Sequence, residues 1–310
     1  MSEIIFGPVN SRRFGKSLGI DLSPTLKQCN FDCVYCELKG AKPIKKMQDV
    51  VPVKDVINSL KEALVKHSNI DVITITANGE PTLYPYLDNL VTEINKIKQS
   101  HKLLILSNGA SIVDKKIQKT LEKIDIVKLS LDCASPKCFK KIDRPYSDID
   151  LNSIIESIKS FSHSFRGSLV IEILVVEGIN DKEEEFEKLN IVLNGIKPTR
   201  VDISTIDRPP AYRVKQVSMD RLKELANLIE NLHVSLAYRK DYDGAKHSFS
   251  QDEILNLISK RPQSYEDIDV SFDDESKKRF RKLLDIGQVD KEEIAGVCFY
   301  TKGSKNKITL

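Results

Sequence analysis

The sequence predicts an α/β protein in which a series of parallel βα units is followed by a small, mostly helical unit. Between about residues 17 and 206, short runs of β-branched residues alternate with amphipathic helical patterns, which is typical of parallel βα units. The alternation stops at a polar turn around residues 242–245. A chain of 310 residues has room for one large domain and one small one. We therefore expect domains at 1–242 and 246–310.

The strands and helices of the large domain can be assigned in order. Six parallel strands are expected at 17–22, 72–76, 102–107, 126–131, 169–176 and 201–206. The first helix follows Pro52, and its apolar residues Val53, Val56, Ile57 and Leu60 recur at helical spacing. Similar apolar stripes predict helices at 87–97, 114–124, 151–161, 183–193 and 219–232, before a short closing strand within VSLAY.

Six βα units form either an open doubly wound sheet or a partly closed barrel, and periodicity does not choose between these. In both folds the active site lies at the carboxyl ends of the parallel strands. Polar motifs follow four of the predicted strands at 78–80, 107–109, 130–132 and 177–181. A cysteine cluster follows the first strand, so these groups are expected to share one end of the sheet.

Residues 246–310 have a different pattern. Ser250 and Glu253 form a capping box at the start of a helix, and two further helices and two strands joined by a polar turn follow. This order predicts a winged helix-turn-helix domain. Basic residues crowd its third helix, which favours RNA or other nucleic-acid contact: Lys277, Lys278, Arg279, Arg281 and Lys282. The region nevertheless holds 12 Lys and Arg against 12 Asp and Glu, so docking of a substrate, a partner or a second copy remains an alternative.

Three of the six cysteines, Cys29, Cys33 and Cys36, lie within eight residues with x3 and x2 spacing. Three thiolates from one loop are enough to hold three irons of a [4Fe-4S] cluster and leave the fourth iron open. Bacterial ferredoxins use x2 spacings and a fourth cysteine, and structural zinc normally has four closed ligands. No His lies near the triplet. An open cluster, and therefore chemistry at it, is the favoured interpretation.

The segment CNFDCVYC resembles the signature of the radical S-adenosylmethionine (SAM) superfamily, including the aromatic residue, Tyr35, before the last cysteine. The resemblance implies an α/β partial (β/α)6 TIM barrel whose cluster binds SAM at the open iron. It also implies an external one-electron donor of the flavodoxin or ferredoxin type. Reduction then cleaves SAM to methionine and a 5′-deoxyadenosyl radical, which abstracts hydrogen from a substrate.

The resemblance also assigns roles to the polar motifs. NGEP, at 78–81, matches a segment that receives the SAM ammonium, and Tyr35 is expected to meet the adenine through its backbone. The other residues are expected at the ribose, carboxylate or adenosyl group, so that the SAM-binding set is Tyr35, Gly79, Glu80, Ser107, Asn108, Ser130, Asp132, Glu172 and Ile179. The turns at 108–109 and 178–181 are alternatively plain turns. Glu172 is alternatively a buried charge paired with a lysine such as Lys128.

A closer similarity covers residues 7–24, 128–145 and 201–212, which resemble the wyosine-synthase-like Fe-S oxidoreductases, a group commonly bearing a C-terminal winged helix. This similarity implies tRNA or RNA base modification. Wyosine synthesis itself is not expected, because those enzymes carry a second, upstream cysteine triplet and no cysteine precedes Cys29 here. The alternatives are a protein or small-metabolite substrate, or a non-enzymatic Fe-S regulator that reads DNA.

The remaining cysteines, Cys133, Cys138 and Cys298, are expected to be free buried thiols rather than the remains of an auxiliary site. Four arginines in the similar segments are expected either to contact a substrate or SAM anion or to form ion pairs: Arg12, Arg13, Arg144 and Arg208. No secretory leader and no apolar stretch of about 18 residues is present. We therefore expect a cytoplasmic protein without membrane contact.

Overall fold

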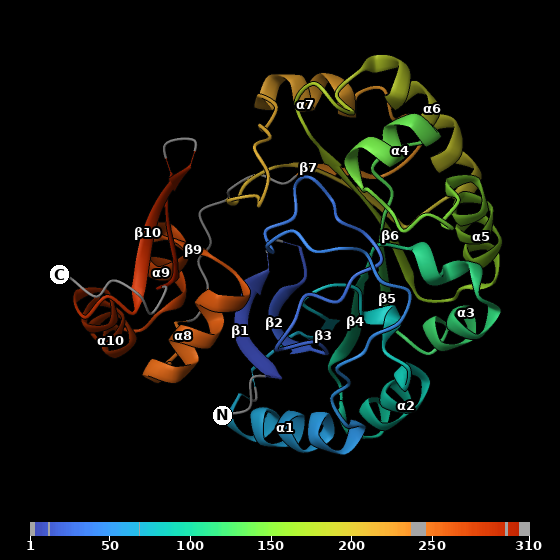
Figure 1. Ribbon diagram of the computed structural model, residues 1–310. Coiled ribbons are helices and arrows are strands. Elements are labelled where there is room, and N and C mark those ends of the chain that lie inside the picture. The colour runs from blue at the N-terminus through green and yellow to red at the C-terminus, as the bar shows by residue number, and fades with distance from the viewer. Residues whose placement is uncertain (1–3, 12, 68, 237–245, 295–296, 304–310) are drawn as a thin grey trace.

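A computed structural model describes residues 4–11, 13–67, 69–236, 246–294 and 297–303. Its main feature is a curved eight-stranded sheet in which the strands follow one another in chain order (Figure 1). The strands are β1 (Ile5–Ser11), β2 (Gly15–Asp21), β3 (Val72–Thr76), β4 (Lys102–Ser107), β5 (Ile126–Ser130), β6 (Ser168–Val175), β7 (Arg200–Thr205) and β8 (Val234–Leu236). All neighbouring pairs from β2 to β8 are parallel.

The six predicted parallel strands are confirmed, and the sheet is an open one because β1 and β8 lie at its two edges. The short strand expected within VSLAY is β8. The sequence did not predict β1, which pairs antiparallel with β2. Gly7 and Pro8 interrupt it, and the register shifts between Phe6 and Val9, so its side chains do not show the regular alternation of a strand.

Helices cover the outer side of the curved sheet (Figure 1). They are α1 (Val53–Lys66), α2 (Leu87–Ile97), α3 (Lys115–Leu121), α5 (Leu151–Ser164), α6 (Glu183–Ile196) and α7 (Met219–Ala226), with 3-10 turns at Pro81–Leu83 and Ala110–Val113. A further short helix, α4 (Pro136–Ile142), lies inside this ring, where its last residue bonds to the cysteine loop. The predicted helices are present, although α7 ends at Ala226 rather than 232. Helix α4 was not predicted, because seven residues are too few to establish a helical period.

The C-terminal region contains α8 (Gln251–Lys260), β9 (Gln263–Ser264), α9 (Tyr265–Ser271), α10 (Asp274–Asp285), β10 (Val289–Ile294) and β11 (Val297–Lys302). Its three strands form a separate antiparallel sheet in the order β10-β11-β9. The predicted capping box between Ser250 and Glu253 is present. Its apolar residues form a hydrophobic cluster separate from that of the large sheet. The expected boundary at 242–245 lies outside the described residues.

The C-terminal region packs against the β1–β2 hairpin and the loop after β2. Phe6 and Val9 of β1 contact its hydrophobic cluster. The Lys260 ammonium lies 2.6 Å from the Asp21 carboxylate at the end of β2, and both side chains are buried. Among the described helices, none has the length and apolar character that crossing a bilayer requires.

Candidate active site

The three clustered cysteines lie in the loop between β2 and α1 and line one cavity at the carboxyl ends of the parallel strands. The cavity has a volume of about 210 Å³. Most of the residues predicted from sequence also line it, namely Tyr35, Gly79, Glu80, Ser107, Asn108, Ser130 and Glu172. The fold therefore brings together motifs from five separate segments, as expected for groups that follow the carboxyl ends of parallel strands.

Gly79 allows the cysteine loop to lie directly against the end of β3. Its φ is +135°, and it forms a parallel bridge with Gln28, the residue before Cys29. A Cβ atom at Gly79 would lie 2.0 Å from the Gln28 carbonyl oxygen. The Gln28 side chain holds the far end of the loop, because its Oε1 accepts hydrogen bonds from the Gln48 and Asp49 amides. The position of Cys29 thus depends on a close backbone contact.

Glu80 joins the ends of β3 and β4. Its Oε1 accepts hydrogen bonds from the Thr82 amide at 2.9 Å, the Thr82 hydroxyl at 2.6 Å and the Ser107 hydroxyl at 2.8 Å, and its Oε2 accepts the Asn108 amide at 2.7 Å. Burial raises the pKa of Glu80, although these donors oppose the rise. The carboxylate is thus occupied mainly by protein donors, and it fixes the placement of Ser107 and Asn108.

The donor set fits an iron–sulfur cluster. Burial raises the pKa of the Cys29 thiol to about 12 and raises the pKa of Cys33 and Cys36 as well. Buried thiols become thiolates readily only when a metal binds them. None of the three is in a disulfide, and all three face the same cavity. Three soft ligands on one loop, with an open cavity beside them, suit a cluster that keeps one iron available.

Asp132 lies beside the cavity and positions Tyr35. The Tyr35 hydroxyl donates to Asp132 Oδ2 at 2.5 Å, and the Leu174 amide donates to Asp132 Oδ1 at 2.7 Å. Burial raises the pKa of Asp132 to about 7. Asp132 does not line the main cavity but lines a small adjoining hollow with Asn108 and Ser130. Its contacts indicate that it supports the Tyr35 ring.

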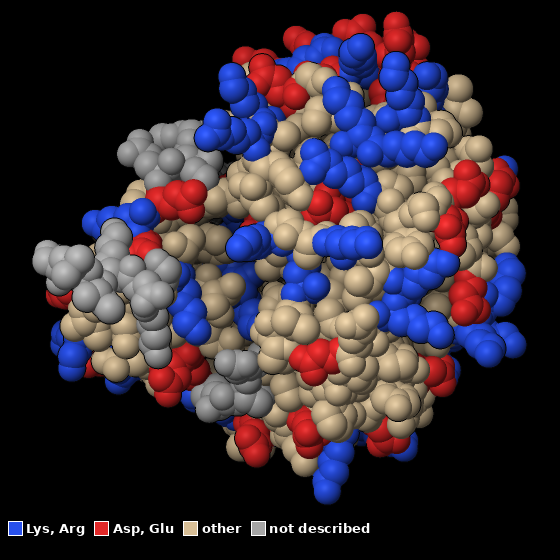
Figure 2. Space-filling model, viewed as in Figure 1, with Lys and Arg blue, Asp and Glu red and all other residues tan. Residues whose placement is uncertain are grey.

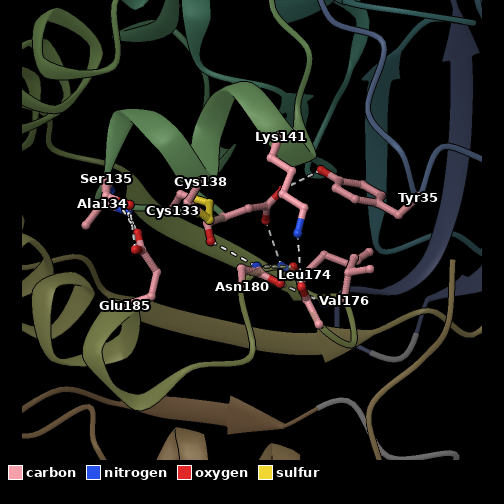
Figure 3. Close-up of a disulfide and its surroundings, with 12 residues drawn as sticks. Tyr35, Cys133, Ala134, Ser135, Cys138, Lys141, Leu174, Val176, Asn180 and Glu185 are labelled. Atoms are coloured by element: carbon pink, nitrogen blue, oxygen red, sulfur yellow. Dashed lines mark hydrogen bonds between the residues drawn. A yellow bond between two sulfur atoms is a disulfide. The ribbon is translucent and has the colours of Figure 1, made fainter.

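The expectation that Cys133 and Cys138 are free thiols is wrong. They form a disulfide, with their Cα atoms 5.8 Å apart (Figure 3). The pairing was missed because it depends on α4, whose first turn carries Cys138 back toward Cys133 at the end of β5. Glu185 of α6 accepts the amides of Ala134 and Ser135 beside the disulfide. Cys298 is free, as expected, and is partly buried.

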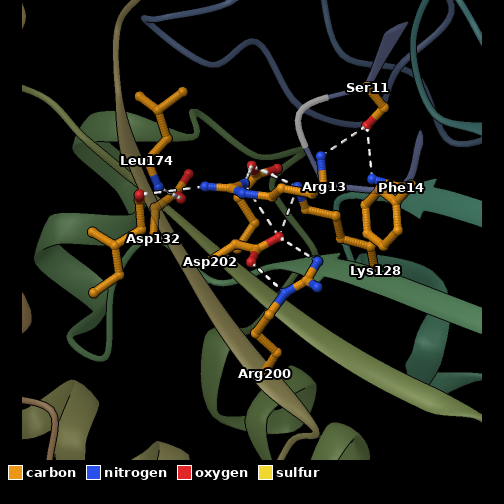
Figure 4. Close-up of polar contacts among 10 residues, drawn as sticks. Ser11, Arg13, Phe14, Lys128, Asp132, Leu174, Arg200 and Asp202 are labelled. Atoms are coloured by element: carbon orange, nitrogen blue, oxygen red, sulfur yellow. Dashed lines mark hydrogen bonds and ion pairs between the residues drawn. The ribbon is translucent and has the colours of Figure 1, made fainter. Parts of the chain in front are cut away.

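Glu172 takes part in an ion-pair network with residues of neighbouring segments. Its Oε1 lies 2.7 Å from Lys128 Nζ and 3.0 Å from Arg13 Nη1. Arg13 also lies 3.2 Å from Asp202, which pairs with Arg200 at 2.7 Å (Figure 4). Burial raises the pKa of Glu172, but the two cations outweigh it and hold the pKa below its ordinary value. Glu172 therefore forms the ion pair with Lys128 that was the alternative to a role at SAM, although its side chain also lines the cavity.

The remaining predicted residues that the structure describes lie outside the cavity. Ile179 packs against the hydrophobic core and does not line the cavity. Arg208 donates to the Pro262 carbonyl and lies 3.6 Å from Glu37. The Arg144 guanidinium lies 4.4 Å from the centre of the Tyr212 ring. Arg12 lies outside the described residues.

Several residues around the cluster loop were not singled out from sequence. Lys27 lines the cavity, and its ammonium lies 3.1 Å from Asp32 Oδ1. Asp143, at the end of α4, places its Oδ1 3.3 Å from Cys33 Sγ. Lys27 and Asp32 lie within a few residues of the cysteines, so their proximity to the ligands was a usable signal. Asp143 carried no such signal, because α4 brings it to the loop from far along the chain.

Comparison with known proteins agrees with this site. The family model described as "Radical SAM superfamily" matches residues 23–189. A UPF0026 protein of Helicobacter pylori (strain J99) is 44% identical over 299 residues, which is 96% of this chain and 97% of that protein.

Two solved structures resemble this one in fold. The first is Streptococcus suis SuiB bound to the precursor peptide SuiA, with 20% identity and a TM-score of 0.57 over 71% of this chain and 48% of that chain. The second is a radical SAM methyltransferase from Sphaerobacter thermophilus, with 13% identity and a TM-score of 0.59 over 72% of this chain and 66% of that chain.

The family match includes the three cysteines and the polar motifs after β3, β4 and β5. The protein is therefore an enzyme of this class, and its cofactors are a [4Fe-4S] cluster and SAM. The chain belongs to the radical SAM superfamily, and it resembles the UPF0026 proteins over almost its whole length.

Proposed function

We propose that Cys29, Cys33 and Cys36 hold the cluster and that SAM binds in the adjoining part of the same cavity. The observation that carries this proposal is the convergence of the cysteine loop and the ends of β3, β4 and β5 on one cavity. When bound and reduced by one electron, the cofactors supply a 5′-deoxyadenosyl radical that abstracts hydrogen from the substrate. Gly79, Ser107, Asn108 and Ser130 are proposed to bind SAM. Glu172 and Tyr35 border the space for its adenosyl group.

The protein residues position the cofactors and shield them from water. Glu80 is proposed to hold Ser107 and Asn108 rather than to rely on direct contact with SAM, because most of its acceptor sites are already used. Asp132 is proposed to hold the Tyr35 ring over the loop. We place the electron donor, of the flavodoxin or ferredoxin type, and the enzyme itself in the cytoplasm, where such donors operate.

Anaerobic reconstitution should give a protein with about four irons per chain. With SAM and dithionite, this protein should release 5′-deoxyadenosine and methionine, because the open iron binds SAM. Iron analysis and chromatography of the small-molecule products measure both results. Samples without dithionite and without SAM are the controls. Bound zinc in place of iron, or iron without any 5′-deoxyadenosine, would contradict the proposal.

We further propose that the substrate is RNA. Three segments, at 37–46, 136–144 and 211–216, adjoin the cysteine loop. The first follows it in the chain, the second is joined to it by the hydrogen bond from Val34 N to Ile142 O, and the third by the bond from Ala211 N to Cys36 O. They carry ten exposed basic residues: Lys39, Lys42, Lys45, Lys46, Lys137, Lys140, Lys141, Arg144, Arg213 and Lys215. Their one exposed acidic residue is Glu37. Basic side chains accordingly gather on this face (Figure 2).

Two aromatic rings lie among these basic residues. Lys45 Nζ, which also pairs with Asp148, lies 5.0 Å from the centre of the Tyr146 ring, and Arg144 lies over Tyr212. Basic side chains interleaved with aromatic rings suit single-stranded nucleic acid, whose bases stack on such rings while its phosphates meet the cations. A protein or small-metabolite substrate would not require this combination.

The C-terminal region is proposed to be a winged helix, because its elements follow the order helix, strand, two helices and hairpin. The basic residues of α10 are less available than the sequence indicates. Lys277 pairs with Asp269, Lys278 lies 2.7 Å from Glu275, and Arg279 donates to the Phe249 carbonyl. The basic face formed by the three segments beside the cysteine loop is therefore the better candidate for the main RNA contact, and α10 for a secondary one.

Two matched double charge reversals separate these surfaces. Lys140→Glu with Lys215→Glu should lower the affinity for total tRNA about tenfold at low salt. The slope of log affinity against log salt concentration should also become shallower, by the equivalent of about two phosphate contacts. Lys278→Glu with Arg281→Glu changes the net charge equally and should have a smaller effect. Filter binding over a range of salt concentrations measures both. Unchanged binding in both variants would favour a protein or small-metabolite substrate.

A further inference from the structure

The three cysteine sulfurs have different surroundings. Cys29 Sγ lies 3.4 Å from the Phe31 amide and 3.7 Å from Asn108 Nδ2. Cys33 Sγ lies 3.3 Å from Asp143 Oδ1. Lys27, two residues before Cys29, lines the same cavity as the three cysteines. A full positive charge therefore lies in the cavity wall beside the cysteine loop.

The Lys27 ammonium is held in this position. Its side chain is 9% exposed, and its Nζ lies 3.1 Å from Asp32 Oδ1. Asp32 is itself fixed, because it accepts the Ala41 amide at 3.2 Å and the Tyr212 hydroxyl. Lysine side chains are seldom this buried, since burial of the ammonium is costly without a partner. The ion pair with Asp32 keeps the cation at the cavity rather than in solvent.

We propose that Lys27 is a positioning residue that raises the reduction potential of the cluster through its fixed charge in the cavity wall. This inference rests on the proposed function, because it requires the cluster at these cysteines. Reduction adds one electron, supplied by the external donor, and forms no bond at this step. The cluster and its thiolates become more negative, so a fixed cation stabilises the reduced form more than the oxidised form. Hydrogen bonds and charges around ligand sulfurs tune such potentials.

The experiment is a redox titration of the reconstituted protein, followed by the electron paramagnetic resonance signal of the reduced cluster. Lys27→Met keeps a side chain of similar length without the charge. It should lower the ratio of reduced to oxidised cluster about tenfold at the wild-type midpoint, which corresponds to about 59 mV for one electron. Lys27→Arg keeps the charge, so its midpoint potential should stay close to that of the wild-type protein. Lys61→Met, which removes an exposed charge on α1, should leave it unchanged.

Asp32→Asn separates charge from simple disruption of the loop. The asparagine keeps an oxygen for the Ala41 amide but removes the negative charge near Cys36, so the midpoint should shift to a more positive potential. Opposite shifts in Lys27→Met and Asp32→Asn, at equal iron content, support the proposal. Shifts of the same sign, or no shift in Lys27→Met, overturn it. If the wild-type protein itself holds no cluster, the proposed function fails as well, so the two failures are distinguishable.

Discussion

Replacing Cys33 by alanine should abolish cluster binding and reduce 5′-deoxyadenosine formation by on the order of a thousandfold or more, because the cofactor supplies the chemistry itself. Cys33 is one of three thiols that line the cavity, and no other cysteine lines it. Among the described residues, the nearest replacements are already joined in the Cys133–Cys138 disulfide. Iron content and product formation after identical reconstitution measure the effect.

Cys298→Ala is the matched control, because it removes a free, partly buried thiol from the C-terminal region. This variant should bind iron and cleave SAM as the wild-type chain does. Thermal unfolding of both variants before reconstitution checks that they are folded. A Cys33→Ala protein that kept its iron and activity would contradict the assignment of the ligands.

Gly79→Ala should prevent the cysteine loop from docking against β3. The added Cβ would lie 2.0 Å from the Gln28 carbonyl oxygen and 2.3 Å from its carbon, which are backbone atoms that a side-chain rotation cannot move away. The φ of +135° is also unfavourable for alanine. Strain and overpacking together should lower the free energy of unfolding by about 3 kcal/mol or more. Iron uptake should fall with it, since Cys29 follows Gln28 directly.

Urea unfolding of the iron-free proteins and iron content after reconstitution test this expectation. Gly287→Ala is the control, because Gly287 also has a positive φ, +69°, but its Cβ would meet nothing within 4 Å. This substitution should lower the free energy of unfolding by about 1 kcal/mol, because of its backbone conformation alone. It should leave iron uptake unchanged. Equal effects of the two substitutions would show that the close contact with Gln28 does not matter.

Much of the fold could be predicted because the parallel strands are buried on both faces. Segments such as β4 and β6 therefore appear as nearly continuous apolar runs with recognisable ends. The exceptions have specific causes. The edge strand β1 contains Gly7 and Pro8 and an irregular register, while α4 is too short to show a helical period. Local pattern fails where an element is short or irregular.

The candidate site was predictable as a set of residues but not as a set of contacts. Cysteine spacing and the positions of strand ends are properties of the sequence itself. The occupation of Glu80 by donors from β4, the ion pairs of Glu172 and the Asp132–Tyr35 hydrogen bond all depend on which strands become neighbours. The Cys133–Cys138 disulfide likewise required α4. Sequence thus indicated which groups converge, while tertiary structure decides how they share partners.

The ion pair between Lys260 and Asp21 bears on how the two regions can be studied separately. Asp21 Oδ1 accepts the Asn78 amide, next to Gly79, while its other oxygen faces Lys260 of α8. Shortening the chain before residue 246 would remove this cation and also the hydrophobic cluster that Phe6 and Val9 contact. The C-terminal region therefore cannot be treated as a detachable module, and a truncated enzyme that loses activity would say nothing about RNA.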